Sequence, residues 1–436
     1  MARWPLHPPP LDDELLSSWL TRLATGYEME PDTFCQHVLD LPQQSLSSID
    51  TDPPAGLLAT LADHTGWSIS RVEATTLRRY EGILFETLDQ PDTQTTSSGL
   101  PRFHPDWRRG DEVIREPRKG QHLTPWLLPR EPVAAVPFCP RCLSDGPVIY
   151  PRTAWHLALS VVCRRHEGVL WDHCPACAKP VWRCWVNGTP PGWERCWCGV
   201  ALAQAPTVRA PESVLWLADR FHEALTTGRV LFDGLSSMSA RCYFVTVRAF
   251  VECIRLRRVG QSWAESCWRH QGIDPVGMCH QLATPFEGQP LPWRLRILDL
   301  VGTLLMQWPH GFLASCQRVS LNVPTLLARV QGLPVAMLEP LLEVLGAQDP
   351  PTVTHFLMAT RGEASGLWED LHGWAQRYLS ACRRAGMSTR TIQSRSFSFP
   401  QPFYEALDDV LFDERVERAV ARALDRARRR WRQGLP

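Results

Sequence analysis

The sequence predicts a mainly α protein. It has an N-terminal helical domain of helix-turn-helix character, a central tandem zinc-ribbon or zinc-finger module with short strands, and a C-terminal helical domain containing further helix-turn-helix units. Apolar residues recur at helical spacing before the centre of the chain and again after Pro211. Eight of the fifteen cysteines fall between Cys139 and Cys198, and six of these form three closely spaced pairs. We therefore predict domains at 1–86, 138–205 and 206–436, with an extended connector over 87–137.

The composition indicates a globular protein, with 44% hydrophobic and 21% charged residues among 436. No apolar run reaches the ~18 residues of a spanning helix, and the N-terminus lacks the apolar core of a secretory signal. We therefore expect a cytoplasmic protein with no membrane partner. In a reducing compartment, clustered cysteines indicate bound metal rather than disulfides.

Charge is distributed unevenly along a chain whose formal net charge is zero. Residues 1–138 hold 12 basic and 20 acidic residues, a net of −8, whereas 139–200 carry +3 and the remainder +5. A neutral chain has no global attraction to nucleic acid. The acidic first domain favours a protein partner over DNA.

The N-terminal domain should begin with a helix over Asp12–Tyr27, capped by Asp12 and Asp13, and a second helix should follow Pro31. A helix-turn-helix pattern spans 57–77, with Ala62, Gly66 and Val72 at the small, turn and aliphatic positions. A plain αα-hairpin explains the same pattern equally well.

After Pro211 the periodicity predicts helices, which we place at 212–227, 239–258, 261–270, 293–308, 323–331, 335–346, 367–384 and 404–431. Two more helix-turn-helix triplets occur there: Ala328, Gly332 and Leu338, and a weaker set of Cys382, Gly386 and Ile392. The segment 414–433, which includes the end of the last helix, carries eight arginines against three acids. That pattern fits a solvated amphipathic face, or else a contact with nucleic acid or an acidic protein.

The first set of metal ligands follows the spacing C-x2-C-x20-C-x2-H. It consists of Cys139, Cys142, Cys163 and His166. Zinc prefers four tetrahedral sulfur or nitrogen ligands, and two such knuckles supply them. The intervening Trp155–Val162 reads as a strand leading into the second knuckle.

The second set begins after seven further residues and consists of Cys174, Cys177, Cys196 and Cys198. Gly199 fits a tight turn whose amides point at sulfur. His173 and Cys184 lie nearby, but four donors already complete the shell, so packing or surface exposure explains them better. Both shells are closed by protein, which predicts two structural Zn²⁺ per chain and no open position for catalysis.

No other chemistry is evident in the sequence. It lacks a P-loop, a dinucleotide-binding glycine motif and a nucleophile elbow, and the deaminase zinc signature is absent because Glu167 directly follows His166. Nothing nominates a nucleophile or a general base. We therefore expect a protein that is not an enzyme.

The segment WPLHPPPLDDELLSSWLTRLA, followed by C-P-x-C, a tryptophan-bearing C-x2-H segment, a second C-P-x-C and C-x-C-G, resembles the TniQ family of transposon targeting proteins, which includes TnsD-type target selectors. The resemblance covers about residues 3–200. It implies a non-catalytic protein that links a target to an AAA+ ATPase of the TnsC/TniB type, which recruits the transposase. Some RNA-guided members form head-to-tail dimers, so a homodimer is a possible state.

By analogy with the family, the N-terminal residues that would face the ATPase are Trp4, Leu6, Asp12, Asp13, Glu14 and Trp19. The target at the other end is either an RNA-guided Cascade or Cas effector, or DNA read by the C-terminal helix-turn-helix units. The segment after Gly332 has no basic residue, which disfavours base reading there. The better candidates for contact with nucleic acid or the effector are Arg390, Arg395, Arg428, Arg429 and Arg430.

Overall fold

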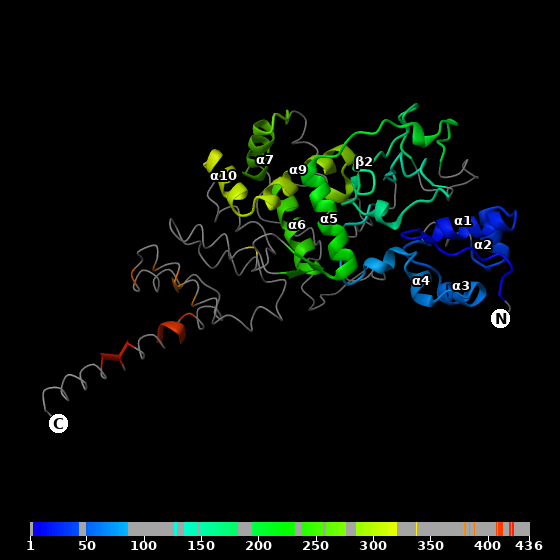
Figure 1. The fold of residues 1–436 in the computed structure, drawn as a ribbon, viewed down its shortest axis with the longest axis horizontal. Helices are drawn as coiled ribbons and strands as arrows, with labels where there is room; N and C mark the ends of the chain where they lie inside the picture. Colours follow the sequence, from blue (N-terminus) through cyan, green and yellow to red (C-terminus); the bar gives the residue numbers. More distant parts are fainter. Residues whose placement is uncertain are drawn as a thin grey trace, which may run out of the picture.

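A computed structural model of the chain describes residues 3–42, 49–85, 126–128, 135–146, 148–181, 194–231, 237–255, 259–275 and 285–320, with isolated residues beyond. Figure 1 shows an N-terminal group of helices at one end (blue) and a larger group of helices further along (green to yellow). The metal-binding segment (cyan to green) lies beside both groups.

The N-terminal unit is built from four short helices and a 3₁₀ turn. These are α1 (Leu16–Gly26), α2 (Pro31–His37), α3 (Leu57–Thr65), α4 (Ile69–Glu73) and η2 (Leu77–Tyr80). They enclose their own apolar core, which is centred on Trp19, Leu23, Phe34, Leu61 and Val72. The apolar stripe predicted for the first helix is therefore the face that it buries.

The first helix begins at Leu16 rather than at Asp12, and the predicted caps are wrong. Asp13 has a φ of +60° and Leu15 is extended, so the chain is not yet helical there. A distant carboxylate caps the helix instead: Asp50 accepts hydrogen bonds from the Ser17 amide and hydroxyl, both at 2.8 Å. The physical reason is that Asp13 and Glu14 are held in other contacts, described below.

Helices α3 and α4 form a hairpin around Gly66, whose φ is +73°. The positive φ favours glycine there, and a Cβ would also displace the Arg3 guanidinium, which would lie 2.7 Å from it. Helix α4 is only five residues long. The predicted turn is therefore confirmed, whereas the choice between a helix-turn-helix unit and a plain αα-hairpin stays open.

The metal-binding segment holds little regular structure. It contains η3 (Thr153–His156), the antiparallel pair β1 (Val162–Cys163) and β2 (Gly168–Val169), and η4 (Leu202–Gln204). The predicted strand over Trp155–Val162 is wrong for most of its length. Trp155 and His156 belong instead to the 3₁₀ turn that begins at Thr153, whose amide donates to the Asp13 carbonyl.

The C-terminal unit packs helices around a small hairpin. Its elements are α5 (Glu212–Thr227), β3 (Arg229–Val230), β4 (Met238–Ser239), α6 (Ala240–Arg255), α7 (Val259–His270), η5 (Phe286–Gly288), α9 (Leu291–Met306) and α10 (His310–Arg318). Helices α5 and α9 approach closely at Gly302, where a Cβ would lie 2.4 Å from the Ser213 carbonyl oxygen. The sequence predicted four of these five helices; α10 was missed because it is short and follows Trp308-Pro309.

One apolar core runs from the metal-binding segment into the C-terminal helices. Trp126, Leu127 and Leu128 are buried in it, so this part of the predicted surface connector is not on the surface. The helices predicted beyond residue 320, and both later helix-turn-helix triplets, lie outside the described residues apart from isolated positions. No helix in the described part of the chain is long and apolar enough to cross a membrane.

Candidate metal centres

The first predicted ligand set converges on one point. The Sγ atoms of Cys139 and Cys142 lie 3.4 and 3.3 Å from Nδ1 of His166, and the Sγ of Cys163 lies 3.6 Å from it. The sulfurs of Cys142 and Cys163 are 3.6 Å apart. Ligands at about 2.0–2.3 Å around a tetrahedral zinc are separated by about 3.5–3.8 Å. The four donors therefore fit one metal ion without rearrangement.

Asp145 sets the orientation of the His166 ring by contacting the ring nitrogen that faces away from the sulfurs. Its Nε2 faces the carboxylate of Asp145 at 2.7 Å, which leaves Nδ1 directed at the three sulfurs. Metal-binding histidines usually donate their other ring nitrogen in this way, which fixes the tautomer and raises ligand basicity. Asp145 is a functional residue that the sequence analysis missed; its only signal was an acid three residues after Cys142.

The second set converges in the same manner. The sulfurs of Cys174 and Cys198 are 3.6 Å apart, as are those of Cys177 and Cys196. All four sulfurs lie within 4.8 Å of one another. Among the described residues, these two clusters are the groups of three or more potential ligands that could hold a metal ion.

Backbone amides favour the thiolate form of one of the four cysteines, Cys174. Burial raises the pKa of the Cys174 thiol. The amides of Cys177 and Ala176 donate to its sulfur, and these hydrogen bonds lower the pKa to about 6. A thiolate is the form that binds metal. Gly199 has a φ of +86°, which confirms the predicted tight turn, but its amide donates to the Cys196 carbonyl and not to sulfur.

His173, the additional candidate that the structure describes, belongs to neither cluster. His173 is half-exposed and pairs through Nδ1 with Asp172 at 2.5 Å, outside both clusters. Cys184 lies outside the described residues. The surface interpretation of His173 agrees with its position.

The acidic loop before α1 docks on the metal-binding segment. Asp13 accepts a hydrogen bond from the Thr153 hydroxyl through its carboxylate and one from the Thr153 amide, at 2.7 Å, through its carbonyl. The Tyr80 hydroxyl lies 3.1 Å from the same threonine oxygen, and Arg79 lies 3.6 Å from the Asp13 carboxylate. Burial raises the pKa of Asp13, against the lowering effect of these partners.

Two of the residues predicted to face a partner are enclosed in the fold. Trp19 is fully buried, and its Nε1 donates to the Pro8 carbonyl at 2.9 Å. Glu14 is buried and accepts hydrogen bonds from Ser18 and Arg22. Both side chains thus stabilise the N-terminal unit, and direct contact of Trp19 and Glu14 with a partner stays a prediction.

The other predicted contact residues remain accessible to different degrees. Leu6 is 48% exposed, and Tyr27 binds both its amide and its carbonyl through the phenol. Trp4 is half-buried and stacks on His64 at 4.7 Å. Asp12 is exposed. The C-terminal candidates Arg390, Arg395, Arg428, Arg429 and Arg430 lie outside the described residues.

Buried charged residues that no sequence pattern predicted join the metal-binding segment to the C-terminal helices. Glu287 accepts hydrogen bonds from Arg248 and from the Trp126 amide, and the Arg248 guanidinium lies 4.9 Å from the centre of the Trp126 ring. Although burial raises it, Arg248 and these hydrogen bonds hold the pKa of Glu287 below its usual value. Arg294 is fully buried and donates to the Ala158 carbonyl at 2.5 Å.

A comparison with family models identifies the part of the chain that contains these contacts. The TniQ family model matches residues 5–170. Residues 5–170 are a TniQ domain. The resemblance seen in the sequence is thereby confirmed for this segment, and the TniQ domain implies a role in the targeting of transposition. A comparison with curated proteins gives no significant match.

The TniQ domain takes in the N-terminal unit, its acidic docking loop and the whole first metal centre. The second metal centre and helices α5 to α10 follow it in the chain. Asp13 and Thr153 thus meet within the matched segment, although 140 positions separate them.

Proposed function

We propose that the chain is a transposition targeting adaptor. It links an RNA-guided Cascade or Cas effector to an AAA+ ATPase of the TnsC/TniB type, and that ATPase recruits the transposase. The observation that supports this role most directly is the docking of the N-terminal unit on the first metal centre through Asp13 and Thr153. An adaptor must hold its two partner-binding ends in a fixed relation. The contact between Asp13 and Thr153 holds the N-terminal unit against the first metal centre.

We propose zinc as the metal at both centres. A set of three cysteines and one histidine, and a set of four cysteines, are ligand combinations typical of structural zinc. Each set already supplies four donors, so no position is left for a reacting water. The centres would then stabilise a segment that has little regular secondary structure of its own.

The proposal is tested with purified full-length protein and its candidate partners. Pull-down of both the ATPase and the effector complex by this chain, with neither partner retaining the other in its absence, is the expected result. Size-exclusion chromatography with light scattering on the same sample gives the oligomeric state, including any homodimer. Failure to bind either partner contradicts the adaptor function.

A second candidate function is selection of a DNA target site. It is supported by the net charge of +5 after residue 200, which includes Arg390 and Arg395. A gel shift on the attachment-site DNA over a salt series separates the two functions. Tight, sequence-selective binding by this chain alone favours the selector, whereas a CRISPR array beside the gene favours the adaptor.

A further inference from the structure

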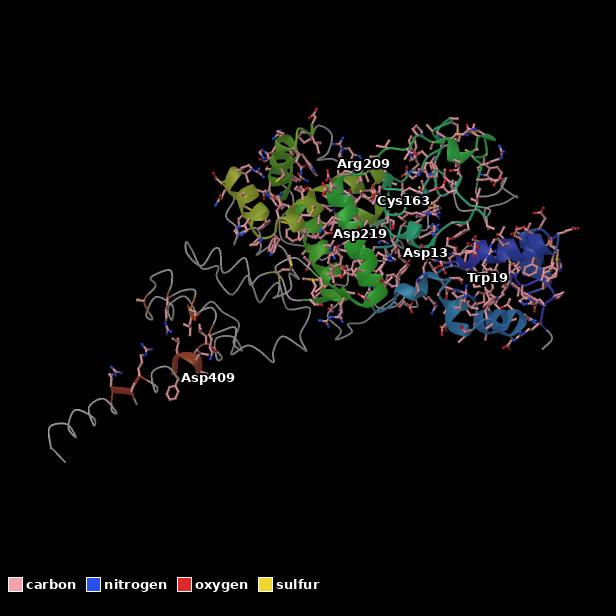
Figure 2. The ribbon with its side chains drawn as sticks, viewed as in Figure 1. Asp13, Trp19, Cys163, Arg209, Asp219 and Asp409 are labelled. Atoms are coloured by element: carbon pink, nitrogen blue, oxygen red, sulfur yellow. The ribbon has the colours of Figure 1, made fainter. Side chains whose placement is uncertain are left out.

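A groove of about 1440 Å³ runs where three parts of the molecule meet. One wall comes from α3, α4 and η2 of the N-terminal unit, and the other from the first metal centre and α5. Figure 2 labels Asp13 and Cys163, which line it, near this junction, together with Asp219 of α5. The groove exceeds the roughly 300–1,000 Å³ typical of sites for small molecules. Its size therefore indicates a macromolecular segment.

The floor of the groove is apolar. The partly exposed Leu11, Leu58 and Leu225 line it, above Leu157, Leu159, Phe221 and Phe244, which the fold already buries. Such a floor offers burial to the apolar face of an incoming helix, which is one of the recurring ways that proteins recognise peptides.

The wall formed by the first metal centre and α5 is basic. Its charged or titratable groups are Arg152, Arg164, Arg165 and His222. Arg164 pairs with Asp219 at 2.7 Å, whereas Arg165 is exposed and makes no hydrogen bond or ion pair with any residue that the structure describes. Burial lowers the pKa of His222, and the positive charge of Arg164 lowers it further. A lowered pKa favours the neutral form of His222, so the positive charge that no described residue neutralises on this wall is that of Arg165.

The opposite wall carries both signs of charge. Arg78 pairs with Asp52 at 3.0 Å, and Arg79 lies 3.6 Å from Asp13. Exposed carboxylates of Asp12 and Glu73 also line the groove. A channel for nucleic acid requires neutralisation of a continuous row of phosphates, and these carboxylates would repel it. The charge pattern favours a protein segment.

We propose that this groove docks an amphipathic helical segment of a partner protein. The apolar face of the segment lies on the floor, and acidic residues along one edge face Arg165 and Arg152. This inference rests on the proposed adaptor function, since it assigns a place on the chain to one of the two partner proteins. The proposal also assigns a role to the junction between the TniQ domain and α5, because both contribute lining residues to the groove.

Two exposed positions allow the groove to be altered without disturbing the core. Arg165→Glu reverses the unpaired charge, and Ala59→Trp fills the wall from α3. Arg209→Glu is the matched control, because Arg209 is also exposed but does not line the groove. Metal content and thermal unfolding of all three variants should match the wild type.

The probe is an array of overlapping 20-residue peptides that tile the ATPase and the effector subunits, titrated against the full-length chain. We expect at least one acidic amphipathic peptide to bind, with affinity reduced about tenfold by Arg165→Glu or Ala59→Trp and unchanged by Arg209→Glu. Hydrogen exchange should show protection of α5 and of the residues around Arg165.

Several results would overturn the groove proposal. Among them are the absence of any groove-dependent peptide, and binding that both groove variants leave unchanged. Salt-dependent binding of a 30-nucleotide single strand that Arg165→Glu abolishes would identify a nucleic-acid site instead. If full-length partners bind both groove variants normally, the groove proposal fails while the adaptor function stands. If no full-length partner binds wild type, the adaptor function fails.

Discussion

The Thr153 side chain donates a hydrogen bond to the carboxylate of Asp13, while its amide donates to the Asp13 carbonyl at 2.7 Å. This paired contact joins the loop before α1 to the 3₁₀ turn that precedes the second knuckle of the first metal centre. Asp13 has a φ of +60°, a conformation that non-glycine residues adopt infrequently. The contact therefore selects a backbone geometry that the local sequence does not favour.

Asp13→Ala should loosen the N-terminal unit from the metal-binding segment. It removes the acceptor for the Thr153 hydroxyl and for the Ala154 amide, a loss of about 2 kcal/mol. The measurement is urea unfolding followed by tryptophan fluorescence, with limited proteolysis to detect separation of the two parts. Asp12→Ala is the control, because Asp12 is exposed and binds Tyr150 only through its backbone carbonyl. Equal effects of the two variants would contradict the role of Asp13.

Each chain should carry two zinc ions. Cys139→Ser should lower the content to about one ion per chain, because it removes a ligand from a closed four-donor shell. Inductively coupled plasma mass spectrometry of the purified protein measures this directly. Cys242→Ser in α6 should leave the content unchanged, since Cys242 belongs to neither cluster. A wild-type content below two ions would argue against the assignment.

Asp145→Asn should weaken metal binding at the first centre alone. The carboxylate holds His166 through Nε2, and loss of such a partner typically costs about 10- to 100-fold in metal affinity. Competition with a chromogenic chelator should show one ion released faster and the other at the wild-type rate. Faster release of both ions, or of neither, would mean that Asp145 does not orient the ligand.

Glu287→Gln should destabilise the junction between the metal-binding segment and the C-terminal helices by about 2 kcal/mol at pH 7, because it removes the most deeply buried carboxylate partner of Arg248 and leaves only Glu252, at 3.2 Å. The folded-state pKa of Glu287 is depressed. Its stabilising contribution is therefore complete above the unfolded-state value of about 4.5 and is lost as the pH falls through the lower folded-state value.

Unfolding free energies measured from pH 7 down to pH 3 should thus show the difference between wild type and Glu287→Gln shrinking with acidity. Glu265→Gln is a suitable comparison, because the Arg269 side chain that it pairs with is largely exposed and surface pairs contribute about 0.2–1 kcal/mol. A difference between wild type and Glu287→Gln that stays constant with pH would show that Glu287 is not ionised in the fold.

Gly66→Ala should cost more stability than Gly56→Ala. Both glycines have positive φ, so each substitution incurs left-handed strain of about 1–2 kcal/mol. Only at Gly66 would the new Cβ also meet the Arg3 guanidinium, at 2.7 Å, whereas nothing lies within 4 Å at Gly56. Thermal unfolding of the two variants compares them, and a double variant with Arg3→Ala should recover part of the extra loss. Equal losses would show that Arg3 yields freely.

The metal ligands were predictable because only one or two residues separate the two members of each ligand pair. Cys139 and Cys142 must lie close together in any fold, and the same holds for Cys163 and His166. Helical periodicity likewise located α1, α2, α5, α6, α7 and α9, since the buried stripe of a helix depends on neighbours three and four residues away. Short elements such as α10 carry too few residues for the period to show.

The sequence by itself determined the two donor sets, the mainly helical class and the family of the first part of the chain. Tertiary structure decided what the acidic signature residues do. Asp13 docks on Thr153, Glu14 is buried with Arg22, and α1 is capped by Asp50 from 33 positions away. An aspartate or glutamate can stand in the same local sequence whether its carboxylate contacts a partner protein, a helix N-terminus or a buried guanidinium. Only the long-range packing of the chain, which no local spacing encodes, sets which of these groups it meets.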